Sequence, residues 1–139
     1  MSSADTQLTE ARATLNARAN AIEEAYEFML AYAGQGLASD SGSAKGTQVR
    51  EYLAKCEKAL GELTQYAASF PTSGDAAPLA AFLRVIDNDA RNARAAVALV
   101  LAQPAISSQV VDNLNASMHL RAVLTDLFLV DEVLKGHRG

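Results

Sequence analysis

The chain has 139 residues, a length that fits a single helical domain with an ordinary buried core. Half of the residues are hydrophobic but only 6% are aromatic, a mixture that favours helices packed closely on small side chains. The net charge of −4 at pH 7 argues against a nucleic-acid partner, because phosphate binding requires clustered lysine and arginine.

Three features of the sequence favour a cytoplasmic protein that does not enter a membrane. Cys56 is the only cysteine, so no disulfide can form within the chain. The first nine residues lack the basic start and the apolar stretch of a signal peptide. The longest apolar run, residues 95–102, is far shorter than the roughly 20 residues that cross a bilayer.

The first predicted helix spans residues 6–33. Large apolar residues recur every seven positions along it: Leu8, Leu15, Ile22 and Met29. This spacing is typical of one buried helix face. Gly34 and Gly36 end the helix, because glycine adopts the left-handed conformation at a helix end without steric cost. Residues 37–46 are small and polar, and we expect them to form a mobile linker.

The second predicted helix spans residues 47–69, with Thr47 as its N-cap. Its apolar residues alternate between four- and three-residue steps: Val49, Leu53, Cys56, Leu60, Leu63, Ala67 and Phe70. These residues form one continuous seam on the helix. Because Cys56 lies in the seam, we expect it to be a small buried apolar residue rather than a reactive thiol.

The third predicted helix spans residues 76–102. Its seam has the same alternating spacing: Leu79, Leu83, Ile86, Ala90, Ala93, Val97 and Val100. Asp87 and Arg91 lie one turn apart outside this seam, which predicts an ion pair on the surface. After Arg94 the helix is apolar all round, and this pattern predicts burial on more than one side.

The fourth predicted helix spans residues 106–135. Its seam consists of Ala116, Leu120, Val123, Leu127, Val130 and Leu134. Four further large apolar residues lie outside this seam: Leu124, Phe128, Leu129 and Val133. One seam cannot bury both sets, so we expect a second contact surface on this helix.

Together these segments predict an all-α fold, an antiparallel up-down-up-down four-helix bundle. The surplus of apolar side chains on the third and fourth helices predicts a homodimer, or contact with another protein. The residues expected at this interface are Leu99, Leu101, Leu124, Phe128, Leu129 and Val133.

An acidic stretch on the first helix gives an enzymatic alternative. Glu23-Glu24-Ala25-Tyr26-Glu27 resembles the Glu-Glu-x-x-Glu element of all-helical nucleoside triphosphate pyrophosphohydrolases. The resemblance implies a magnesium-dependent enzyme in which Glu23, Glu24 and Glu27 hold the metal against the substrate phosphates. The family's second element, Glu-x-x-Asp on the following helix, is missing from this sequence.

A third interpretation is a sensor of a small ligand. Small side chains on facing helices, at Ala19, Ala90 and Ala93, would leave a cavity between them. The tyrosines that would line it are Tyr26, Tyr52 and Tyr66. The sequence has no phosphate loop, no Glu-x-x-His motif and no arrangement of a catalytic triad, so we assign no catalytic residue and no cofactor. These patterns favour a non-enzymatic adaptor- or chaperone-like interaction protein over both alternatives.

Overall fold

The computed structural model describes residues 3–70 and 77–136, and every regular element in these ranges is an α-helix. The helices are α1 (Ser3–Ala33), α2 (Ala44–Ser69), α3 (Ala77–Leu101), α4 (Ser108–Ala116) and α5 (His119–Gly136). The predicted all-α class is confirmed. The predicted four-helix bundle is not confirmed, because the described part of the chain contains five helices.

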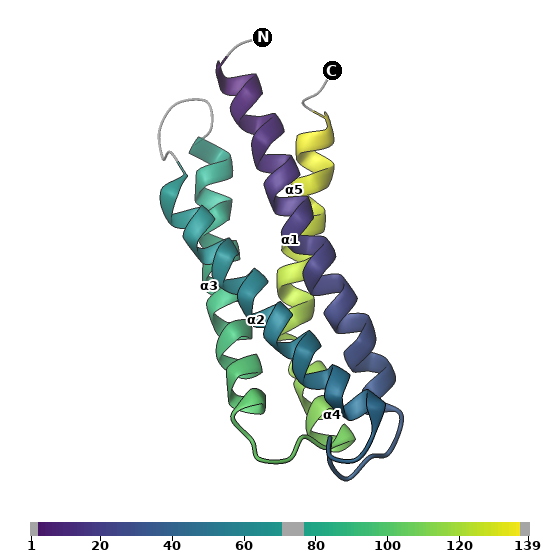
Figure 1. Ribbon diagram of the computed structural model, residues 1–139. Coiled ribbons are helices and arrows are strands. Elements are labelled where there is room, and N and C mark those ends of the chain that lie inside the picture. Colours follow the sequence, from purple (N-terminus) through teal and green to yellow (C-terminus); the bar gives the residue numbers. More distant parts are fainter. Residues whose placement is uncertain (1–2, 71–76, 137–139) are drawn as a thin grey trace.

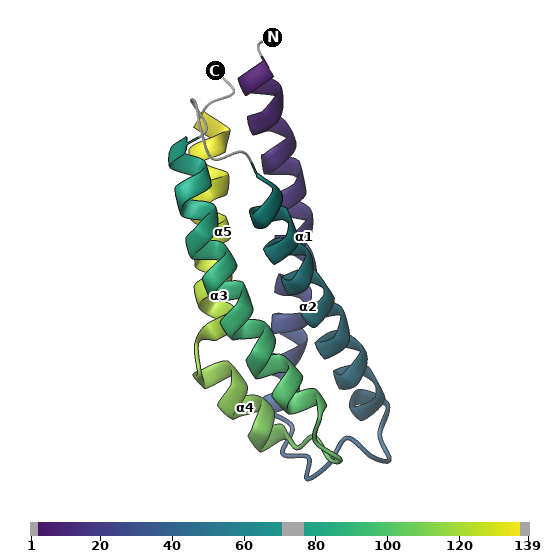
Figure 2. The same ribbon diagram turned by 90° about the vertical axis from the view of Figure 1, so that its left-hand side faces the viewer.

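Four of the helices, α1, α2, α3 and α5, run side by side along the length of the molecule (Figures 1 and 2). Each packs against two of the others, in the order α1, α2, α3, α5 and back to α1. The beginning of α1 and the end of α5 lie at the same end of the molecule, and α4 lies at the opposite end (Figure 1). Helix α5 is therefore flanked by α1 on one side and by α3 on the other.

The core follows the apolar seams that the sequence predicts. Buried seam residues of α2 are Val49, Leu53, Cys56, Leu60 and Leu63, and Phe70, which caps the end of α2, is buried as well. Those of α3 are Leu83, Ile86, Ala90, Ala93, Val97 and Val100. Burial, with a smaller effect of the Glu57 charge, raises the pKa of the Cys56 thiol to about 12. Cys56 is therefore protonated and unreactive at neutral pH.

The single helix predicted over residues 106–135 is interrupted between α4 and α5. The Ser117 hydroxyl donates to a carbonyl oxygen of the last turn of α4 (2.6 Å), and this bond competes with helix continuation. Met118 then adopts a φ of +67°, a left-handed conformation that ends the helix. The buried amide of Asn115 donates to the Met29 carbonyl (3.3 Å), which fixes α4 against α1. The apolar spacing continues across this break, so the spacing alone predicts one helix.

Helix α2 begins earlier than the sequence predicts. Its N-cap is Ser43 rather than Thr47, because the Ser43 hydroxyl accepts the backbone N–H of Gly46 (2.9 Å). The preceding loop passes so close to this first turn that a Cβ atom on Gly46 would lie 1.7 Å from the Asp40 carbonyl oxygen. Only glycine allows this approach.

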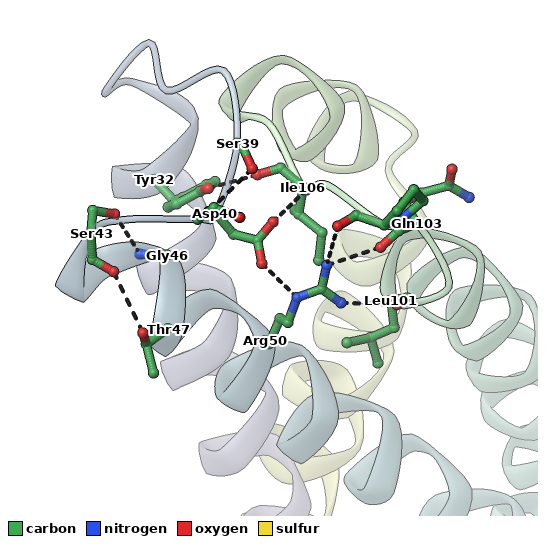
Figure 3. Close-up of polar contacts among 12 residues, drawn as sticks. Tyr32, Ser39, Asp40, Ser43, Gly46, Thr47, Arg50, Leu101, Gln103 and Ile106 are labelled. Carbon is green, nitrogen blue, oxygen red and sulfur yellow. Dashed lines mark hydrogen bonds and ion pairs between the residues drawn. The ribbon is translucent and has the colours of Figure 1, made fainter.

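Arg50 of α2 joins the loop before α2 to the loop after α3 (Figure 3). Its Nε donates to the Asp40 carboxylate (2.5 Å), and its two Nη atoms donate to the carbonyl oxygens of Leu101 (3.2 Å) and Gln103 (2.9 Å). The other Asp40 oxygen accepts the backbone N–H of Ile106 (2.7 Å). Hydrogen bonding to Arg50 lowers the pKa of Asp40 to about 2. We call these five residues the loop clamp.

Further hydrogen bonds hold the same loop, so the expectation of a mobile linker over residues 37–46 is wrong. The N–H of Leu37 donates to the Ser108 hydroxyl (2.9 Å), and the N–H of Ser108 donates to the Leu37 carbonyl (2.8 Å). The Ser108 hydroxyl donates in turn to the Tyr32 carbonyl (2.7 Å), and the Tyr32 hydroxyl donates to the Ile106 carbonyl (2.7 Å). The two loops and the end of α1 therefore form one polar network.

Ion pairs also join α1 to its neighbours. The pairs between helices are Arg12 with Asp131 and Arg18 with Glu62. The side-chain amide of Asn16 donates to the same Asp131 carboxylate (3.0 Å), which strengthens the contact of α1 with α5. The ion pair predicted between Asp87 and Arg91 is confirmed, with Nε and Oδ1 3.0 Å apart on the surface of α3.

Candidate interaction surface on helix α5

The outward side of α5 carries large apolar side chains that the chain itself leaves in solvent. Phe128, Leu129 and Val133 are 52%, 54% and 53% exposed. The opposite side of the same helix is buried at Leu120, Val123, Leu127, Val130 and Leu134. Because exposed apolar clusters are typical of binding surfaces, we name Phe128, Leu129 and Val133 the α5 apolar face.

The other predicted interface residues are distributed differently. Leu124 is only 5% exposed, so its expected place outside the core is wrong: it packs between the buried seam of α5 and α1. Leu99 is 67% exposed and Leu101 is half-buried, but both lie near the end of α3 and line neither groove beside α5. Four of the six predicted residues thus lie on α5, and three of these four are exposed.

A first groove is lined by α3, α5 and Leu8 of α1, near the end of the molecule that holds the start of α1. Its volume is about 330 Å³. The lining residues are all apolar: Leu8, Pro78, Leu79, Phe82, Leu129, Val130, Val133 and Leu134. We call it the α3–α5 groove. Such a lining suits hydrocarbon side chains and offers no side-chain partner to a polar or charged group.

A second groove lies between α5 and α1, with a volume of about 480 Å³. We call it the α1–α5 groove, and its lining mixes charged and apolar residues: Glu23, Tyr26, Glu27, Leu30, Arg121, Leu124, Thr125 and Phe128. Glu23 and Glu27 lie one turn apart on α1, while Arg121 comes from α5. The α5 apolar face therefore stands between an apolar groove and an amphipathic one.

The acidic residues predicted as metal ligands are only partly brought together. Glu23 and Glu27 line the α1–α5 groove, whereas Glu24 is exposed and lines neither groove beside α5. In residues 3–70 and 77–136, no three His, Cys, Asp or Glu side chains are grouped so that they could hold a metal ion. The charged residue that shares the groove with the two glutamates is a cation, Arg121, and this arrangement does not favour a magnesium site.

Two carboxyl groups meet where α3 packs on α5. Burial first, and then the neighbouring carboxyl of Asp89, raise the pKa of Asp126 to about 7. The Oδ2 atom of Asp126 is shielded from solvent and has no hydrogen-bond partner among the described residues. This contact is therefore the least well satisfied polar site along α5.

The residues of the ligand-sensor interpretation lie in different places. Buried alanines occur at the three predicted positions: Ala19, Ala90 and Ala93. Tyr52 stacks on Phe28 with ring centroids 4.4 Å apart, and Tyr66 lies against Phe70 at 5.9 Å. Tyr26 alone among the three tyrosines lines one of the two grooves beside α5. The three tyrosines therefore do not surround one shared cavity.

Leu30 and Arg121 belong to the α1–α5 groove but were not among the predicted site residues. A local signal for Leu30 exists in the sequence. Glu23, Glu27 and Leu30 are spaced four and three residues apart, which places them on one side of α1. The spacing does not predict that α5 is the helix that lies opposite these residues.

No protein family, curated protein or solved structure matches this chain. Across residues 3–70 and 77–136, none of the helices combines the length and hydropathy needed to cross a bilayer.

Proposed function

We propose that the protein is a non-enzymatic interaction module, adaptor- or chaperone-like, that binds a helical surface of a protein through the α5 apolar face. The single observation that carries this proposal is the exposure of Phe128, Leu129 and Val133 between two grooves. In this proposal the fold is an antiparallel four-helix bundle whose fourth member is divided into α4 and α5 at Met118.

The energetic scale of the α5 apolar face supports binding. Each of its three side chains is about half exposed. Completing the burial of one such side chain contributes about 1 kcal/mol, because full burial from water contributes about 1.5–3 kcal/mol. A helix that also fills the hollow of the α3–α5 groove adds further apolar contact.

Photo-crosslinking in the native host tests this proposal. A photoreactive phenylalanine analogue replaces Phe128 in one variant and Val133 in another. The control variant carries the analogue at Lys58, an exposed position on α2. We expect discrete protein adducts from positions 128 and 133 that are absent from position 58, and that disappear when Leu129→Glu is added. Identical adduct patterns from all three positions, or none from any, would contradict the proposed function.

A further inference from the structure

The α1–α5 groove carries charges that the chain does not neutralise. Glu23, Glu27 and Arg121 form no ion pair or hydrogen bond with any described residue, although all three line the same groove. By contrast, Arg12 on α1 pairs with Asp131 on α5 a few turns away. The charges between α1 and α5 are thus paired at Arg12 and Asp131 but unpaired in the α1–α5 groove.

The same groove exposes apolar side chains on both of its walls. Leu30 on α1 and Phe128 on α5 are each about half exposed, and the buried Leu124 lines the groove with them. A partner that covers this surface must supply apolar area together with charges of both signs. A purely basic helix would satisfy the two glutamates but would leave Arg121 facing a like charge.

We infer that the α1–α5 groove is the docking site for a second copy of this chain. This inference rests on the proposed function and names the partner for one of the two grooves. A second copy satisfies the charge requirement because each copy offers two carboxylates on α1 and one guanidinium on α5. A surface that carries both complementary groups can pair with itself about a two-fold axis.

The geometry of such a pair follows from the arrangement of α1 and α5. A two-fold axis along the groove lays α5 of each copy over α1 of the other, at the same level. Arg121 of one copy then faces Glu23 and Glu27 of the partner subunit, because these residues line one stretch of groove. Phe128 and Leu30 of both copies become buried between the subunits. The apolar α3–α5 groove lies outside this contact and stays open to another protein.

Paired charge reversals test this arrangement. One variant carries Arg121→Glu and the other carries Glu23→Lys with Glu27→Lys. Within either variant alone, the groove charges of the two copies repel each other. In a mixed pair, the carboxylate introduced at position 121 of one copy meets the introduced lysines of the other. The native Arg121 of that other copy meets the native glutamates of the first, so both contacts are attractive.

The measurement is the mass in solution by light scattering at micromolar concentration, with helix content and melting temperature recorded for every sample. We expect the wild type to have twice the 14.7 kDa mass of the chain. Each variant alone is expected to associate at least about tenfold more weakly. An equimolar mixture of the two variants should regain the mass of two chains.

Matched controls separate the groove from general charge effects. Arg84→Glu on α3 and Glu24→Lys on α1 are single charge reversals of the same two kinds but lie outside both grooves. Both controls should keep the wild-type mass. A monomeric wild type, or folded charge-reversal variants whose mixture stays monomeric, would overturn the second-copy inference. If cross-links from position 128 or 133 then reach only other proteins, the proposed function stands while this inference fails.

Discussion

The loop clamp and the outward side of α5 differ in whether their side chains find partners within the chain. At the loop clamp, the Arg50 guanidinium and the Asp40 carboxylate find their partners within the chain. On α5, Phe128 remains in solvent and Arg121 has no partner among the described residues. The difference teaches which part of the molecule is complete in one chain and which part is suited to contact another.

The pKa values of two aspartates, one in the loop clamp and one on α5, are shifted in opposite directions. The pKa of Asp40 falls to about 2, chiefly because its carboxylate accepts a hydrogen bond from Arg50. The pKa of Asp126 rises to about 7, because it is buried beside the Asp89 carboxyl. The loop clamp is therefore strongest when its acid is ionised, whereas the contact between α3 and α5 is strongest when its acid is protonated.

The largest effect is expected from Gly46→Ala. The added Cβ would lie 1.7 Å from the Asp40 carbonyl oxygen, so the loop must leave the start of α2 and the loop clamp must open. We expect the free energy of unfolding to fall by about 3–5 kcal/mol, measured by urea denaturation. The control is Gly61→Ala in the same helix, where the added Cβ meets only the flexible Arg94 side chain at 3.2 Å. An equal loss in both variants would show that the loop clamp is not specifically affected.

Alanine substitutions at two positions of α5 compare its inner and outer sides. Leu124→Ala removes a buried side chain and should lower the free energy of unfolding by about 2–3 kcal/mol. Leu129→Ala removes a half-exposed one and should lower it by less than about 1 kcal/mol. Chemical denaturation at low protein concentration measures both. Comparable losses would mean that the α5 apolar face belongs to the core.

Removal of the Arg50 guanidinium should have a smaller effect. In Arg50→Met, the Asp40 carboxylate and two loop carbonyls lose a charged donor. Because the Arg50 side chain is partly exposed, we expect a loss of about 1–2 kcal/mol in the free energy of unfolding. Arg91→Met, which breaks only the surface pair with Asp87, should change it by less than about 0.5 kcal/mol. If Arg91→Met lowered the free energy of unfolding more than Arg50→Met does, the stabilising role of the loop clamp would be contradicted.

The smallest effect is a pH dependence of opposite sign at the two aspartates. The folded pKa of Asp126 lies above its ordinary value of 3.8, so the stability it contributes is complete below about pH 3.8 and is lost as the pH rises through 7. The folded pKa of Asp40 lies below 3.8, so its contribution is complete above that pH and is lost as the pH falls through 2.

Melting curves between about pH 5 and pH 8 isolate the Asp126 contribution, because most carboxylates are already ionised there. The wild type should melt at a lower temperature at the upper end of this range, and Asp126→Asn should reduce the difference. Asp89→Asn should reduce it as well, because it removes the neighbouring carboxyl. An unchanged pH dependence in both variants would show that the contact between α3 and α5 does not titrate.

Most of the helical architecture was predictable from the sequence, because seam spacing is a local property. The seams of α2 and α3 are buried almost as predicted, with Val49 and Ile86 fully enclosed. The break at Met118 was not predictable from spacing, because the apolar spacing continues across it while the Ser117 hydroxyl bonds back to the Leu114 carbonyl and Met118 adopts a positive φ. The ordered loop around Asp40 depends likewise on Arg50 and Ile106, which are far apart in the sequence.

The apolar residues of the candidate surface were largely predictable, but the helices that lie beside them were not. A count of apolar residues indicated that α5 carries more than one seam can bury, and Phe128, Leu129 and Val133 have this role. The count could not distinguish them from Leu124, because a residue at the edge of the seam is buried or exposed according to its neighbouring helix. The grooves arise only when α5 is placed between α1 and α3.

The most direct test of the account asks whether a second copy covers Phe128, the residue of the α5 apolar face that lines the α1–α5 groove. In Phe128→Cys, the new thiol is the reactive one, because the native Cys56 is buried and protonated. The measurement is the rate of alkylation as the protein concentration rises from nanomolar to micromolar, with Lys58→Cys as the control. We predict that position 128 becomes protected as the concentration rises while position 58 does not. Equal rates at both positions across the whole range would contradict the account.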